Sequence, residues 1–276
     1  MADIMMTRLH EWMVVLYAVS LVFYFIDFLN KDKIAHRSAF WILSVVYVMQ
    51  TFVLVMYIVE TKRFPILSLF EGIYFYAWLL ITVSIVLHLF SKVGYGVFFL
   101  NVIGFIFMTI HTFAPAQIEQ SAVAEALISE LLFIHISFAI LSYVAFSMSF
   151  VFAILYLILY KLLKKRKWSK QFGRLPSLQQ AASGMKIGII TGIPFLLISL
   201  ILGTQWANIA LDEWSFFDMK ILGSFFILVV YAVALVFIQT GKLRGNNAAW
   251  ANVFAFLFII INFFLGSTLS GFHLWI

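Results

Sequence analysis

The chain has 276 residues, of which 64% are hydrophobic and only 11% are charged, and its formal net charge is +6. A soluble domain carries about a quarter charged residues, so this composition excludes that class. The chain has no cysteine, which excludes disulfides, thiolate-held clusters and covalent attachment of haem to this chain. Any metal would have to be held by histidine, carboxylate or methionine.

Eight apolar stretches are long enough to cross a bilayer, which takes about 20 residues. They are residues 10–29, 39–59, 66–90, 95–115, 130–160, 187–205, 220–239 and 248–275. Three long segments contain no charged residue at all, namely 39–59, 131–160 and 245–276. This pattern predicts an all-α, polytopic integral membrane protein in which residues 1–276 form one bundle of about eight transmembrane helices.

The basic residues predict the orientation of the chain. Most of the 18 lysines and arginines fall in the first, third, fifth and seventh connections between the spans. Because Lys and Arg accumulate on the cytoplasmic side, both termini are expected outside a multi-pass protein of the cell membrane. The most basic stretch, 161–186, is interpreted as a cytoplasmic loop that fixes topology and attracts anionic lipid, and not as a nucleic-acid site.

The histidines can be sorted by their expected depth. His111, His135 and His273 are expected in one outer layer, at the outer ends of the fourth, fifth and eighth spans. A histidine inside a span is costly unless it is paired, hydrated or bound to a metal. Neutral imidazoles on facing helices are a usual way to hold haem iron, although a zinc site stays open as an alternative. His88 is expected near the inner end of the third span, and His36 in an inner loop. Because no histidine partner is expected at the depth of His88, it is interpreted as structural.

The segment "GTQWANIALDEWSFFDMK", residues 203–220, interrupts the apolar second half with aromatic and charged residues. Trp206 and Trp214 would form an interfacial shelf for a macrocycle. Polar groups near its propionates would come from Gln205, Asn208, Ser215 and Lys220. The alternative is an aromatic belt, because tryptophan is enriched at membrane interfaces in any case.

These residues resemble the tryptophan-rich WWD segment of haem-handling cytochrome c assembly proteins of the CcsA/CcmC type. The match rests on Gly203, Trp206, Trp214 and the Asp218–Lys220 pair. The family has an external haem-ligating histidine on each side of this segment. Here "FIHISFAILSYVAF" contains His135 and "GSTLSGFHLW" contains His273, while "RFPILSLFEGIYFYAW" resembles the family's early outer loop. The resemblance covers most of the chain beyond about residue 60.

The resemblance implies that haem b is held by His135 and His273 as metal ligands, with Trp206, Trp214 and Asp218 near the cofactor. The match is partial, because Leu211-Asp212, Phe217 and Met219 stand where the family has Trp-Gly, Trp and Pro. The seventh span also lacks the histidine that the family uses in carrying haem across the membrane.

With these departures and eight spans, the chain is most similar to a regulatory branch of the family. That branch implies a non-enzymatic negative effector of haem synthesis, which lowers the level of glutamyl-tRNA reductase on the cytoplasmic side. Two alternatives stay open. One is a haem-handling subunit of a cytochrome c synthase, and the other is a membrane cytochrome b, which would usually need a second haem near the inner face.

Two carboxylates are expected close to the membrane surfaces. Glu71 either orients a ligand histidine or stays hydrated at the outer interface. Asp27, near the inner end of the first span, is expected to be hydrated.

Overall fold

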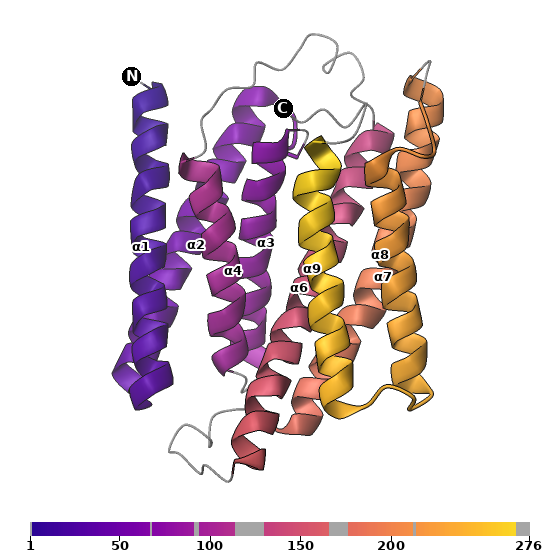
Figure 1. Ribbon diagram of the computed structural model, residues 1–276. Coiled ribbons are helices and arrows are strands. Elements are labelled where there is room, and N and C mark those ends of the chain that lie inside the picture. The colour runs from indigo at the N-terminus through magenta and orange to yellow at the C-terminus, as the bar shows by residue number, and fades with distance from the viewer. Residues whose placement is uncertain are drawn as a thin grey trace. The chain divides into compact units, whose positions relative to one another are not determined.

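The computed structural model describes residues 2–66, 68–90, 94–113, 130–165, 176–211 and 214–268. Within these ranges the secondary structure is helical, without strands, and eight helices are long and apolar enough to cross a membrane (Figure 1). They are α1 (Ala2–Asn30), α2 (Lys33–Thr61), α3 (Leu69–Phe90), α4 (Gly94–Phe113), α6 (Glu130–Lys164), α7 (Leu178–Ala210), α8 (Met219–Gln239) and α9 (Gly245–Thr268). The predicted all-α architecture of eight spans is therefore confirmed, while the assignment of an outer face stays a prediction.

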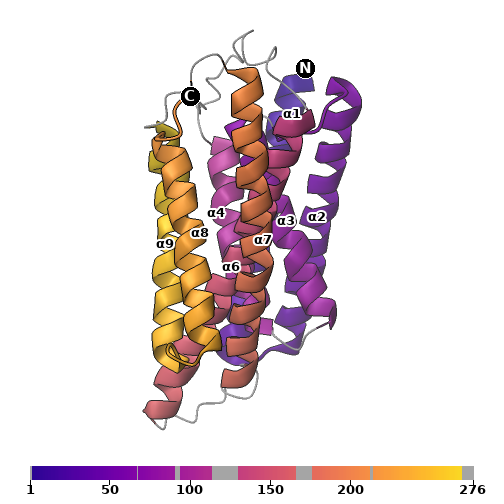
Figure 2. The same ribbon diagram turned by 90° about the vertical axis from the view of Figure 1, so that its right-hand side faces the viewer.

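The helices form two compact units, whereas the sequence was interpreted as one domain. Helices α1 to α4 belong to unit 1, and helices α6 to α9 belong to unit 2. Figure 1 colours the first set from indigo to magenta and the second from rose to yellow, and Figure 2 shows α8 and α9 running side by side.

Unit 1 buries polar side chains that satisfy one another. The Tyr17 hydroxyl donates to the Asn101 side-chain oxygen at 2.9 Å, and the Asn101 amide donates to Ser84 Oγ at 2.9 Å. Where water is absent, each buried polar group must find its partner within the protein, so this chain of bonds joins α1, α3 and α4. The same hydroxyl lies 2.5 Å from where a Cβ on Gly104 would be, so α4 needs glycine there.

Unit 2 is built on a close approach of α6 and α7. Three glycines of α7 recur every fourth residue, namely Gly184, Gly188 and Gly192. A Cβ on Gly188 would lie 2.7 Å from the carbonyl oxygen of Ala145, and one on Gly192 would lie 2.5 Å from the Phe146 ring. Small residues at this spacing let two membrane helices pack backbone to backbone. Phe146 also stacks on Tyr231 of α8 with ring centroids 3.9 Å apart, which ties a third helix to this interface.

Two stretches expected to lie between spans are partly helical. Helix α6 continues to Lys164, and α7 begins at Leu178, so both ends of 161–186 belong to helices, while residues 166–175 lie outside the described ranges. The start of α7 is fixed by a capping box in which Ser177 and Gln180 bond to each other's backbone N–H at 3.1 and 2.8 Å. Residues 203–210 of the tryptophan-rich segment form the last turns of α7.

Candidate functional site

His135 lies five residues into α6 and faces α7. Its Nδ1 is 2.6 Å from the backbone carbonyl oxygen of Ser199, and the Ser199 hydroxyl donates to the carbonyl of His135 at 3.0 Å. Ser199 is fully buried, so this pair of reciprocal bonds holds the imidazole in one orientation between two helices.

The partner of Nδ1 decides which ring nitrogen is free to bind a ligand. A carbonyl oxygen only accepts hydrogen bonds, so Nδ1 of His135 carries the proton and donates to Ser199. The other nitrogen, Nε2, then holds a lone pair, as in metal-ligating histidines whose far N–H is bound by a backbone carbonyl. This hydrogen bond favours the tautomer of His135 in which Nε2 could act as a ligand atom.

Gly203 provides the space for this imidazole. A Cβ at Gly203 would lie 2.5 Å from Cε1, 2.6 Å from Nδ1 and 3.1 Å from Nε2 of His135. Such distances are shorter than real Cβ contacts, so only glycine lets α7 pass this close to the ring. The first residue of the tryptophan-rich segment is therefore in direct contact with the predicted ligand histidine, which lies some seventy positions earlier in the chain.

The tryptophans of the segment lie just beyond this contact. Trp206 is on α7, one turn past Gly203 and on the same side of the helix, because residues three apart are neighbours on a helix surface. Trp214 lies in the connection to α8, where its Nε1 donates to the side-chain oxygen of Asn208 at 3.1 Å. Its ring is tilted against Phe216, with centroids 6.4 Å apart. Both indoles thus belong to the end of unit 2 that carries His135.

Asp218 and Lys220 mark the start of α8. Asp218 caps the helix by accepting from the backbone N–H of Lys220 at 2.9 Å. The Lys220 ammonium lies over the Phe263 ring of α9, 5.9 Å from its centroid. The lysine thereby connects α8 and α9. The predicted second ligand, His273, lies outside the described residues.

The helix that leads to His273 is closely packed on α8. A Cβ on Gly223 would lie 2.0 Å from the side-chain oxygen of Asn262, whose amide donates to Ser224 Oγ at 3.0 Å. A buried asparagine and a glycine thus fix α9 to α8 at this end of unit 2.

His111 was expected in the same outer layer as His135, but it belongs to unit 1 and has its own neighbours. Its ring centroid lies 5.2 Å from that of His10 and 4.9 Å from that of Tyr74. Each of these histidines bonds through Nδ1 to a backbone carbonyl, His10 to Met6 at 2.8 Å and His111 to Phe70 at 3.0 Å. Both residues could be expected at the outer ends of their spans, but sequence analysis did not pair them, because they are about a hundred positions apart.

The interpretation of His88 as a histidine without a histidine partner is wrong. The ring centroid of His36 lies 5.1 Å from that of His88, at an interplanar angle of 22°. The Phe40 ring also stacks on His88, with centroids 4.1 Å apart. His36 Nδ1 also bonds to the carboxylate of Asp27 at 2.9 Å, and Asp27 is only 5% exposed, so it is not hydrated as expected. The error arose because α2 begins at Lys33 and places His36 on a helix and not in a loop.

Glu71 is the centre of a network at the start of α3. Its carboxylate forms a two-pronged ion pair with Arg63 at 2.8 and 3.1 Å, and it accepts from the Tyr57 hydroxyl and from the Ser68 backbone N–H. These bonds fix the connection between α2 and α3. Among the described residues, no set of three or more His, Asp or Glu side chains is arranged to hold a metal ion.

Comparison with known proteins shows the family of the chain. Residues 66–273 match the family model described as cytochrome C assembly protein. The chain belongs to that family. The matched region contains α3 to α9, with His135 and the tryptophan-rich segment, as the resemblance beyond about residue 60 predicted.

Individual relatives extend over the whole chain. The chain is 46% identical to "Protein HemX" of Bacillus subtilis over 99% of both chains, and 39% identical to the protein of that name from Brevibacillus brevis over 97% of both. It is also 28% identical to the cytochrome c biogenesis protein CcsA of Chlamydomonas reinhardtii, over 77% of this chain and 60% of that protein. The two longer matches include α1 and α2, which precede the family region.

Proposed function

We propose that this membrane protein binds haem b at the end of unit 2 that carries His135, and that it is a negative effector of haem synthesis. The observation that supports haem binding best is the His135 ring itself. Its Nδ1 is committed to the Ser199 carbonyl, Gly203 leaves room for the imidazole, and Nε2 remains for iron.

The residues near His135 fit a large, flat, partly charged cofactor. Trp206 and Trp214 supply aromatic surface at the end of α7 and in the connection to α8, and Lys220 at the start of α8 supplies a positive charge. When bound, haem b would supply an iron centre that neutral imidazoles could hold. His135 would provide one and His273 the other, the latter on the grounds of the sequence resemblance.

The regulatory role is supported by a comparison of how much of each relative the chain covers. The chain matches the two HemX proteins from end to end, but it corresponds to only part of the algal cytochrome c biogenesis protein. Helix α8, the predicted seventh span, contains no histidine, so one residue associated with carrying haem through the membrane is missing. The proposal is therefore that the protein lowers the level of glutamyl-tRNA reductase, acting directly or indirectly from the cytoplasmic side, and has no catalytic activity.

A gene deletion tests this role. Deletion is expected to raise the steady-state level of glutamyl-tRNA reductase on an immunoblot while holocytochrome c stays normal. The deletion strain is then complemented with wild type, with His135→Ala and with the matched variant His111→Ala, and only His135→Ala is expected to leave the reductase high. An unchanged reductase level in the deletion strain contradicts the regulatory proposal, and loss of holocytochrome c favours the synthase-subunit alternative.

One observation keeps the cytochrome b alternative in view. His36 and His88 form a ring pair in unit 1, so His88 has the histidine partner that a second cofactor would need. The two rings stack at an interplanar angle of 22°, and His36 Nδ1 already bonds to the Asp27 carboxylate, so packing within unit 1 accounts for this pair without a cofactor. We therefore keep one haem per chain as the prediction, and a count of two would favour electron transfer.

A further inference from the structure

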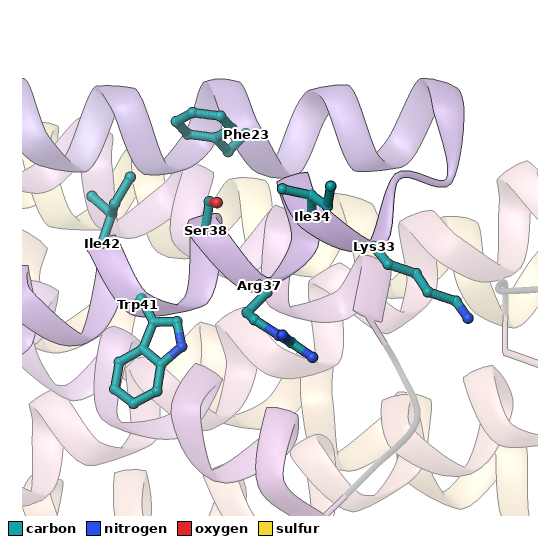
Figure 3. A pocket seen from close by; sticks show the side chains of 7 residues that line it. All are labelled: Phe23, Lys33, Ile34, Arg37, Ser38, Trp41 and Ile42. Carbon is teal, nitrogen blue, oxygen red and sulfur yellow. The ribbon is translucent and has the colours of Figure 1, made fainter.

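A groove lies between α1 and α2 of unit 1, at the end where these helices join. It has a volume of about 530 Å³ and opens on the surface of the unit (Figure 3). The lining residues are Phe23 of α1 and Lys33, Ile34, Arg37, Ser38, Trp41 and Ile42 of α2. Figure 3 shows Lys33, Arg37 and Trp41 in succession along α2, with Phe23 across from them on α1.

The groove carries two positive charges without a counter-ion. Lys33 and Arg37 are exposed and one helical turn apart, and in the part of the chain that the structure describes neither forms an ion pair. Like charges at this spacing repel each other, so an anion bound between them would be stabilising. The nearby carboxylates have other partners, because Asp32 accepts from the N–H of Ile34 at 2.8 Å and Asp27 binds His36.

The rest of the groove is apolar and continues away from the charges. Trp41, one turn beyond Arg37, is 64% exposed, and Ile34 is 77% exposed. Phe23 and Ile42 continue this surface along the two helices (Figure 3). A ligand that complements the whole groove therefore has an anionic head and a hydrocarbon tail.

The predicted topology indicates which molecule has that form. The connection between α1 and α2 is the first of the basic connections and is expected on the cytoplasmic side. The cytoplasmic leaflet carries anionic lipid, and basic pockets between transmembrane helices on that side bind phosphate headgroups. Tryptophan is also enriched at the level of the headgroups.

We propose that this groove is a specific site for an anionic phospholipid. Lys33 and Arg37 bind the headgroup phosphate, the Ser38 hydroxyl is available as a further donor, and an acyl chain lies against Trp41, Ile42 and Phe23. The site is independent of haem binding and of the proposed regulatory role, and it joins the α1–α2 hairpin to the lipid.

The test compares lipids and charge variants on the full-length purified chain. Wild type, Lys33→Gln/Arg37→Gln and a control, Lys242→Gln/Arg244→Gln, are titrated in detergent with phosphatidylglycerol or phosphatidylcholine, and bound lipid is counted by native mass spectrometry. The control removes two exposed cations from the connection between α8 and α9, which are also expected on the cytoplasmic side but do not line the groove. Each groove cation is expected to contribute about five-fold to phosphatidylglycerol affinity, so the groove variant binds at least ten-fold more weakly and the control binds as wild type does.

Several outcomes would overturn the proposal. Equal weakening in both double variants would mean that lipid responds only to overall charge. Equal binding of phosphatidylcholine would mean that the cations play no part. Protection of the wild type against thermal unfolding by inorganic phosphate as strong as that by phosphatidylglycerol would assign the site to a free anion. If the double variant is poorly folded, Arg37→Gln alone is compared with Lys242→Gln, and the proposal requires an approximately five-fold difference between them.

Discussion

Gly203 is a position at the proposed haem site where one added methyl group would disturb the packing around His135. In Gly203→Ala the new Cβ would lie 2.5 Å from Cε1 of His135, whereas ordinary contact begins at 3.4 Å. The ring or α7 must therefore retreat by roughly 0.9 Å, and this displacement acts directly on the 2.6 Å bond from Nδ1 to the Ser199 carbonyl. The substitution moves the imidazole and leaves its chemistry intact.

The size of the effect follows from the overlap. In the free protein the ring can move away from the extra carbon, so haem binding must restore the packed position at a cost of about 1–3 kcal/mol, which weakens binding by roughly 5- to 150-fold. Alanine also favours the helix by about 1 kcal/mol over glycine, so the free energy of unfolding should change less than the affinity. Haem titration of the purified apoprotein, followed by absorbance, measures the affinity, and thermal unfolding measures the stability.

Gly192→Ala is the matched control for this prediction. Its Cβ would lie 2.5 Å from the Phe146 ring in the same α6–α7 interface, but it does not contact His135. It is expected to lower stability to a similar degree and to keep wild-type haem affinity. If Gly203→Ala binds haem as tightly as wild type, or if Gly192→Ala weakens binding equally, the contact between Gly203 and His135 has no special role and the reasoning is refuted.

Three further substitutions separate the site from its surroundings. His135→Ala is expected to remove most bound haem from a protein that still inserts into the membrane, as measured by the absorbance spectrum and by membrane fractionation; equal loss in His111→Ala would show that the ligand is misassigned. Trp206→Ala should speed haem transfer to apomyoglobin several-fold while the spectrum of the bound form is retained, and an unchanged transfer rate would remove the indole from the site. Arg63→Gln leaves Glu71 partly buried without its ion pair, so it should lower the free energy of unfolding by about 1–3 kcal/mol, without changing haem content; a thermal midpoint equal to that of wild type would contradict this.

Hydropathy predicts the existence of the helices well and their ends poorly. The eight spans could be predicted because each needs a long apolar run, whatever its neighbours. The ends depend on polar groups that hydropathy does not register. The beginning of α7 depends on Ser177 and Gln180, and the continuation of α7 to Ala210 includes polar residues of the tryptophan-rich segment. Both features lengthen a helix beyond its apolar run.

The site could be predicted in part, and the reason differs from residue to residue. His135 is recognisable from its position in an apolar span and from the family pattern. Its contact with Gly203 joins two helices and becomes visible only when they are packed. The glycine repeat of α7, in contrast, is present in the sequence as "GMKIGIITG" and was overlooked. The pairing of His36 with His88 was missed because an error of a few residues in the start of α2 changed the expected environment of His36 from helix to loop.

The number of haems bound per chain tests the central claim most directly. Wild-type protein and His135→Ala are purified from haem-replete cells, and haem b is counted by the pyridine haemochrome method and normalised to protein. We predict one haem b per wild-type chain, with the low-spin spectrum of two imidazole ligands, and almost none in His135→Ala. A wild-type protein without haem, or a variant that retains the full amount, would contradict the account.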